Sequence, residues 1–207
     1  FTDYAHKLRT ITIPKGHQVT LNSEGSLNFP IGSIISKTFY YPKADNGVLK
    51  ADDDGSLFKP EVGTRGGLDL EKVRLVETRL LVHRQSGWVA LPYVWNNEQT
   101  EATLEAIGDI KSLELVNGPE PRSFPYIVPD QNQCAGCHGT STASKSVNPI
   151  GPSVANLNRN GYDGNQNQLD AWQADGWLEI NSNSVPAMKD WQDTSNTLED
   201  RARSYLD

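Results

Sequence analysis

The residues with the clearest chemical capacity stand together in one pentapeptide. Cys134-Ala135-Gly136-Cys137-His138 has the C-x-x-C-H spacing of covalent c-type haem attachment and contains both cysteines of the chain. Two residues between the thiols, wound on one helical turn, place both sulfurs along one edge of a porphyrin, where each adds to a vinyl group. The next imidazole then reaches the iron. The pentapeptide predicts haem c, with Cys134 and Cys137 as thioether anchors and His138 as the proximal iron ligand.

Two other uses of these residues fit their surroundings less well. A Cys134–Cys137 redox disulfide needs a preceding strand in a βαβ setting, whereas the approach to Cys134 is rich in proline. A zinc site needs four ligands, and the remaining histidines lie far away in the chain at His6, His17 and His83.

The sixth iron ligand divides electron transfer from ligand chemistry. Met188, fifty residues after His138, is a candidate distal ligand, although a lone methionine filling a gap between side chains fits the same sequence. The three other histidines are alternatives, each in a strand-like context where a solvent-facing side chain is the default. Lys37 would reach an iron only if the β region covers the haem. The sequence leaves these alternatives open.

A second acidic feature has a simpler interpretation. Asp52, Asp53 and Asp54 precede Gly55 as in a calcium loop, but Lys50 then stands where the first carboxylate of the loop belongs. We therefore interpret this segment as a solvated turn.

The elements that must position the pentapeptide change in kind along the chain. Short β-branched and aromatic runs predict strands at 33–40, 73–82 and 88–95, a hairpin from 10–13 and 18–21, and a short helical pattern at 97–107. Four prolines between 119 and 129 predict a linker. Helical pieces follow at 134–138, 166–176 and 197–207. We expect an α+β fold: an antiparallel β domain (1–118), a Pro-rich linker (119–131) and a loop-rich haem segment of short helices (132–207).

Charge and hydropathy exclude some partners. The 207 residues carry a net charge of −7, with a pI near 5.1, so the surface repels phosphate backbones and anionic lipid. The most apolar stretch, 73–82, contains three charged residues and is too short to cross a bilayer. We expect neither a nucleic-acid partner nor a membrane span.

Segments outside the pentapeptide carry a resemblance that runs almost from end to end. They include Phe29-Pro30-x-Gly32, Lys37-Thr38-Phe39, Glu77-Thr78-Arg79-Leu80-Leu81, Tyr93-x-Trp95-Asn96 and Arg201-Ala202-Arg203-x-Tyr205-Leu206-Asp207. With C-x-x-C-H, they resemble a bacterial family of exported c-type haem proteins, most of them uncharacterised. In that family a second C-x-x-C-H typically follows the last segment, so the resemblance implies that the natural chain continues after Asp207. None of the four distal candidates named above, Met188 and the three histidines, belongs to the family pattern.

A fainter likeness concerns the β region. Phe29-Pro30-x-Gly32 followed by Lys37, and later Gly87-Trp88, resemble the cytochrome P-460 group. That resemblance implies a c-type haem beside an antiparallel sheet, an open distal site and a lysine near the haem.

From these observations we expect a c-type cytochrome with one covalent haem that transfers one electron in the periplasm or outside the cell, because haem is attached to exported apoprotein. Its partners would be redox proteins. The alternatives are a P-460-like redox enzyme or gas-binding protein, which takes a small-molecule ligand at the iron, and a self-associating haem relay protein.

Overall fold

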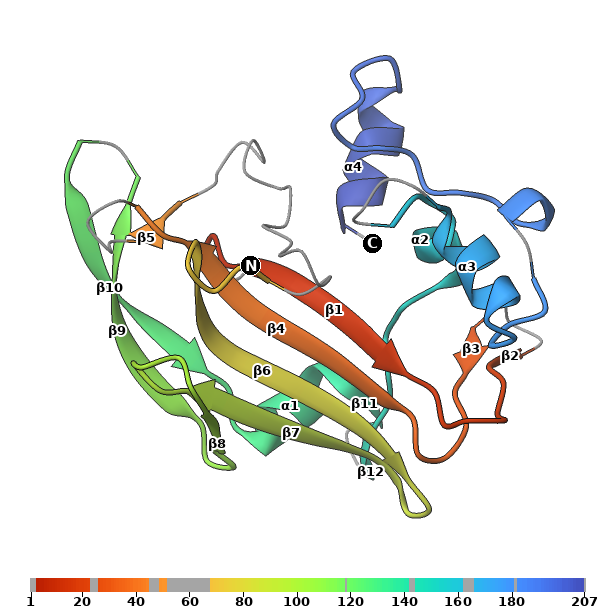
Figure 1. Ribbon diagram of the computed structural model, residues 1–207, viewed down its shortest axis with the longest axis horizontal. Coiled ribbons are helices and arrows are strands. Elements are labelled where there is room, and N and C mark those ends of the chain that lie inside the picture. The colour runs from red at the N-terminus through yellow and green to blue at the C-terminus, as the bar shows by residue number, and fades with distance from the viewer. Residues whose placement is uncertain are drawn as a thin grey trace. The chain divides into compact units, whose positions relative to one another are not determined.

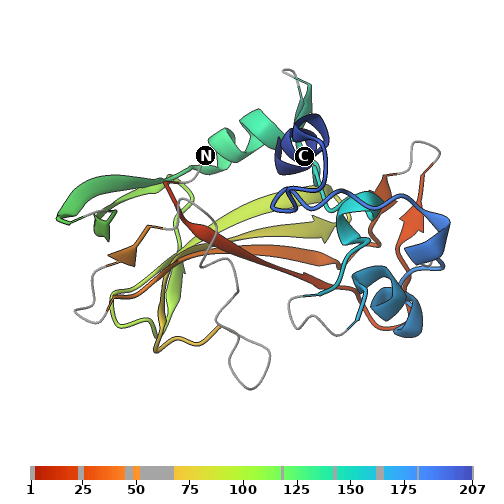
Figure 2. The ribbon, with the colours of Figure 1, turned by 90° about the horizontal axis from the view of Figure 1, so that it is seen from above.

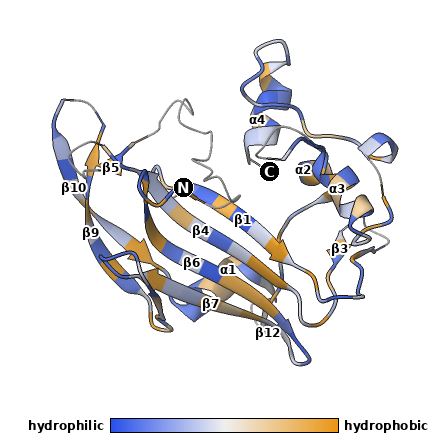
Figure 3. Cartoon of the chain, in the orientation of Figure 1, coloured by the Kyte–Doolittle hydropathy of each residue, from blue (hydrophilic) through white to orange (hydrophobic). Residues whose placement is uncertain are grey.

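Three runs of β-branched and aromatic residues form neighbouring strands. They are β4 (Ile34–Pro42), β6 (Val73–Arg84) and β7 (Gly87–Trp95), and they confirm the strands expected at 33–40, 73–82 and 88–95. The computed structural model describes residues 3–22, 26–44, 49–51, 68–117, 119–141, 144–161, 166–180 and 182–206. Polar residues interrupt the apolar runs of β4 and β6 (Figure 3), so neither strand is apolar along its whole length.

These strands belong to a sheet that is antiparallel throughout. Its order is β1 (His6–Thr12), β4, β6, β7, β12 (Ser144–Val147) and β11 (Gly139–Ser141), and β8 (Ala102–Leu104) also pairs with β7. Figure 1 shows β1, β4, β6 and β7 side by side. The hairpin expected from 10–13 and 18–21 is wrong: β1 pairs with β4, while β2 (Thr20–Leu21) pairs with β3 (Leu27–Asn28). Alternation marks a strand but does not select its partner.

A smaller sheet covers one end of the first. Its order is β10 (Pro121–Val128), β9 (Asp109–Val116) and β5 (Leu49–Lys50). Side chains from both sheets form one buried cluster that includes Phe39, Val76, Leu113 and Tyr126. Residues 119–131, expected to be a linker, thus contain a strand. Its prolines are compatible with the position of β10 at the edge of the sheet, because every second N–H of an edge strand faces away from its single neighbour.

The helical pattern expected at 97–107 is also wrong, and the cause is a tertiary contact. Gln99 has φ +59°, and its side chain accepts a hydrogen bond from Leu75 N (2.6 Å) and donates one to Leu75 O (3.1 Å). Helix-forming residues therefore form a turn and the short strand β8.

The helices are short. They are α1 (Gln131–His138), α2 (Val154–Leu157), α3 (Gln168–Ala174), the 3-10 turn η1 (Ser182–Ser184) and α4 (Leu198–Leu206). α1, α3 and α4 confirm the helical pieces expected near 134–138, 166–176 and 197–207. The protein is α+β, with antiparallel sheets and a few short helices, as the sequence predicts.

The chain divides into two compact units that do not follow the expected boundaries. The first unit comprises residues 1–12 and 31–149, so it contains both larger sheets and α1; the second comprises 13–30 and 150–207. Within the second unit, Val19 N donates to Trp177 O (2.7 Å), which joins its two chain segments. Among the described residues, no helix has the length and apolar character to cross a membrane. The acidic turn at 52–54 lies outside the described residues.

Candidate functional site

The pentapeptide lies on α1, whose start is fixed by its own side chains. Asp130 caps the helix by accepting a hydrogen bond from Gln133 N (2.7 Å), and Gln133 Oε1 accepts one in return from Asp130 N (2.9 Å). This capping box satisfies amides that the first turn leaves unpaired. Cys134 and Cys137 are therefore three positions apart on a formed helix, which puts them on one face.

The turn before β9 supports the start of α1. Gln131 N donates to Ala106 O (3.3 Å), and Gly108 has φ +81°. A Cβ at Gly108 would stand 2.6 Å from Val128 O and 3.1 Å from Asp130 N, so only glycine allows this approach. The smaller sheet thus positions the helix that carries the pentapeptide.

His138 ends α1 in a defined orientation. Its Nδ1 is 2.9 Å from the carbonyl oxygen of Asn148, and Asn148 N donates to the carbonyl of His138 (2.8 Å). Because a carbonyl can only accept, this contact assigns the ring proton to Nδ1 and leaves Nε2 with its lone pair. In many metal-binding histidines one ring nitrogen binds the metal and the other donates a hydrogen bond like this one, which fixes the tautomer and the orientation of the ring.

The two thiols are free and differ in their surroundings. Cys134 is partly buried and Cys137 is exposed. Burial raises the pKa of the Cys134 thiol, the charge of Arg79 opposes this rise, and Glu77 and Asp130 add to it. Cys134 therefore lies near charged groups of the large sheet. Figure 2 shows α1 on one side of the strands β4, β6 and β7.

We call this side of the sheet the helix side and define it by strand register. Residues directly opposite each other on neighbouring strands point to the same side. One rung contains Arg9, Lys37, Arg79 and Pro92, and the next contains Ile11, Ile35, Leu81 and Ala90. The rung after these pairs His83 with Trp88, whose rings stack with centroids 4.5 Å apart. Ile11, Ile35 and Leu81 are only partly buried, so this side keeps apolar surface in contact with solvent.

A buried ionic network of Glu77, Arg79 and Tyr126 lies at one end of the helix side. Glu77 has no solvent exposure and accepts hydrogen bonds from Arg79 Nε (2.9 Å), Arg79 Nη2 (2.6 Å) and the hydroxyl of Tyr126 (2.7 Å). The guanidinium carbon of Arg79 also lies 4.4 Å from the centre of the Phe39 ring. Burial alone would lower the pKa of Arg79, but the hydrogen bonds and charge of Glu77 raise it. Burial and the charge of Glu77 raise the pKa of Tyr126.

The candidate distal ligands fall in different places. Met188 belongs to the second unit, where its sulfur accepts a hydrogen bond from Asn156 Nδ2 (2.6 Å). His6 lies on the side of the sheet away from α1, with its ring 5.4 Å from that of Tyr40. Lys37 and His83 share the helix side. His17 lies in the second unit.

Sequence reasoning missed Glu77, Arg79, Arg9 and Asn148 as parts of the site. Charged residues stand two apart at Lys7 and Arg9 and again at Glu77 and Arg79. This spacing could have placed both members of each pair on the same side of a strand. Only the register, however, brings them opposite Lys37.

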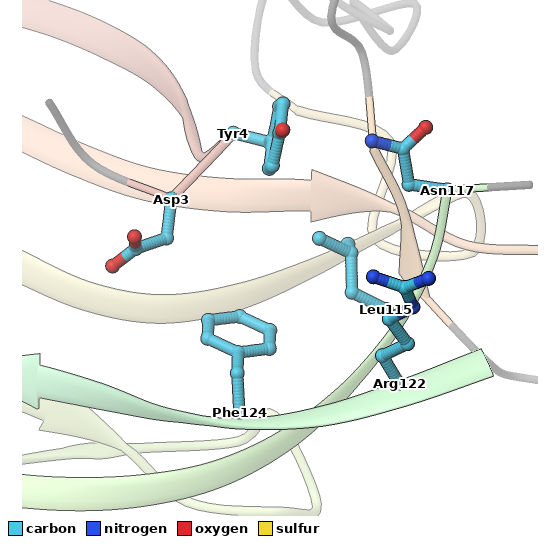
Figure 4. A pocket seen from close by; sticks show the side chains of 6 residues that line it. All are labelled: Asp3, Tyr4, Leu115, Asn117, Arg122 and Phe124. Atoms are coloured by element: carbon cyan, nitrogen blue, oxygen red, sulfur yellow. The ribbon is translucent and has the colours of Figure 1, made fainter.

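The described residues contain a further pocket, which lies apart from the pentapeptide. No group of three or more His, Cys, Asp and Glu side chains is arranged to hold a metal ion in the part of the chain that the structure describes. A separate pocket of about 250 Å³ is lined by Asp3, Tyr4, Leu115, Asn117, Arg122 and Phe124 (Figure 4). It contains no residue of the pentapeptide.

Comparison with known proteins gave no match to any family model, any curated protein or any solved structure.

Proposed function

We propose that this protein is a c-type cytochrome that carries one haem on Cys134, Cys137 and His138 and transfers one electron in the periplasm or outside the cell. The observation that carries the proposal is the hydrogen bond from His138 Nδ1 to the carbonyl of Asn148 (2.9 Å). It leaves Nε2 of His138 free to bind a metal, and the histidine of a C-x-x-C-H sequence is the residue that binds the haem iron.

The donor set fits this cofactor. Both thiols are free and lie one helical turn apart, and the capping box keeps that turn formed before any haem is attached. The bound haem would supply the change between ferric and ferrous iron. The chain would anchor the ring by its sulfurs, orient the His138 imidazole toward the iron and offer partly buried apolar side chains such as Ile35 and Leu81 on the helix side.

The test is covalent attachment in an exported chain. The protein would be produced with a bacterial export leader and a cytochrome c maturation apparatus, beside a Cys134→Ser/Cys137→Ser control. We expect the intact mass of the native sequence to increase by one haem, with a c-type α band in the reduced pyridine haemochrome, while the control keeps the polypeptide mass. Native protein that weighs no more than its polypeptide, or haem that leaves in acid acetone, would contradict the proposal.

A second candidate is a redox enzyme or gas-binding protein with an open distal position, as the P-460 resemblance implies. One observation favours it: the helix side carries Lys37 and His83, whereas the only methionine of the chain, Met188, is engaged by Asn156 in the second unit. Carbon monoxide, cyanide and azide separate the two functions. A low-spin spectrum that none of them changes supports electron transfer, and a high-spin spectrum that shifts supports the second candidate.

A further inference from the structure

Three cations stand directly opposite one another on the helix side. The register pairs Arg9 of β1 with Lys37 of β4, and Lys37 with Arg79 of β6. Lys7 points to the same side, one rung away, opposite Phe39. Like charges directly opposite on neighbouring strands destabilise a sheet, so this row raises the question of what neutralises it.

The described residues neutralise only one end of the row. Glu77 lies on the neighbouring rung, opposite Phe39, and its carboxylate already accepts hydrogen bonds from Arg79 and Tyr126. The Lys37 ammonium lies 5.6 Å from the centre of the Phe39 ring, and no described residue accepts a hydrogen bond from it. Burial, followed by the charges of Arg9, Arg79 and Lys7, lowers the pKa of Lys37 to about 8. In a chain with a net charge of −7, this side of the sheet is positively charged.

The row also lies beside the pentapeptide. α1 contacts β7, and the register continues the row from Arg79 of β6 to Pro92 of β7, so the β6 end of the row is the end nearest α1. In agreement with this position, the charges of Arg79 and Lys37 oppose the rise that burial causes in the pKa of the Cys134 thiol. From β6 the row crosses β4 to β1, a distance of roughly 10 Å at the usual spacing of strands. A haem held by its vinyl edge presents two carboxylates at the other edge of the ring, so a cationic surface that starts at the cysteines and leads away from them suits such a ligand.

We propose that Arg9 and Lys37 form an anion site for the two propionate carboxylates of the haem, while Arg79 remains paired with Glu77. This inference rests on the proposed function, since it needs a haem on Cys134 and Cys137. The same chemistry would also suit a free oxyanion such as phosphate or nitrite, and the experiment must separate the two sources.

The experiment uses the haem-loaded protein and two double variants that each remove two positive charges. Arg9→Gln/Lys37→Gln alters the row. Lys50→Gln/Arg84→Gln is the matched control, because both of its side chains are exposed, Lys50 in the smaller sheet and Arg84 on the side of β6 away from α1. Should the first variant fail to accumulate, Lys37→Met and the charge-retaining Lys37→Arg replace it.

Two readouts follow the carboxylates directly. Loss of cations beside the propionates favours ferric iron, so we expect the reduction potential of the row variant to fall, and to fall further than that of the control. The propionate bending mode in the resonance Raman spectrum should shift down in the row variant only, because its carboxylates lose hydrogen bonds. Lys37→Arg should keep the native values of both.

Each other outcome overturns the proposal in a recognisable way. Native protein without covalent haem removes the proposed function and this inference together. Attached haem with equal potentials in the two double variants, or an unchanged propionate mode, removes this inference alone. If the potential of the native protein changes on adding phosphate or nitrite at constant ionic strength, and that response is lost in the row variant, the row binds free anions instead.

Discussion

Replacing Glu77 by Gln tests whether the buried ionic network holds the helix side together. The substitution keeps the shape of the side chain but removes the charge that Arg79 and Tyr126 bind at 2.6–2.9 Å. Removing one partner of a buried ion pair costs about 3–5 kcal/mol, because the other charge is left without compensation. Glu77 is fully buried but the Arg79 side chain is 29% exposed, so water relieves part of this cost. We expect a loss near the lower limit, about 3 kcal/mol.

The chain offers a matched control for this change. Glu199 and Arg203 make the same type of ion pair at 2.8 Å, but their side chains are 74% and 73% exposed. An exposed helical pair of this spacing contributes about 0.2–0.5 kcal/mol, so Glu199→Gln should be nearly neutral. Urea unfolding, followed by circular dichroism and analysed at constant m-value, gives both free energies of unfolding.

A double variant separates charge from packing. Glu77→Gln/Arg79→Met removes both charges and leaves no buried guanidinium without a partner, so it should recover much of the stability that Glu77→Gln loses. If Glu77→Gln costs no more than Glu199→Gln, the network does not stabilise the sheet and the reasoning fails.

Three further changes test the support of α1 and the charge of the row. Gly108→Ala should lower the free energy of unfolding by about 1–3 kcal/mol through strain and the contact with Val128 O, clearly more than Gly16→Ala, where φ is +78° but no atom lies within 4 Å; thermal unfolding of the two variants measures the difference. Asp130→Ala removes the cap of α1, which costs about 0.5–2 kcal/mol and should reduce the fraction of chains with attached haem in intact-mass spectra; a yield equal to that of the native chain would contradict this role. In the chain produced without haem, Lys37 binds its proton less tightly when folded than when unfolded. The free energy of unfolding should therefore rise with pH between about 8 and 10.5, and Lys37→Met should remove most of that rise in urea titrations across the pH range.

The sequence predicted elements better than it predicted their neighbours. The strands at 33–40, 73–82 and 88–95 follow from β-branched and aromatic runs, and the helices near 134–138, 166–176 and 197–207 follow from spacing and caps. The expected hairpin, the helix at 97–107 and the linker at 119–131 failed for a shared reason. In each case a distant partner decided the outcome: β4 for β1, Leu75 for Gln99, and β9 for β10.

By itself the sequence determined that two thiols and an imidazole lie together, because their short fixed spacing needs only one helical turn, and the structure has that turn in α1. The tertiary structure decided what surrounds it. Asn148 becomes the partner of His138 when β12 folds back on β11 and pairs Val147 with Gly139, whereas Arg9, Lys37 and Arg79 meet only through the register of three strands. Strand register is set by pairing between segments far apart in the chain, and a shift of one residue would turn each of these cations to the opposite side.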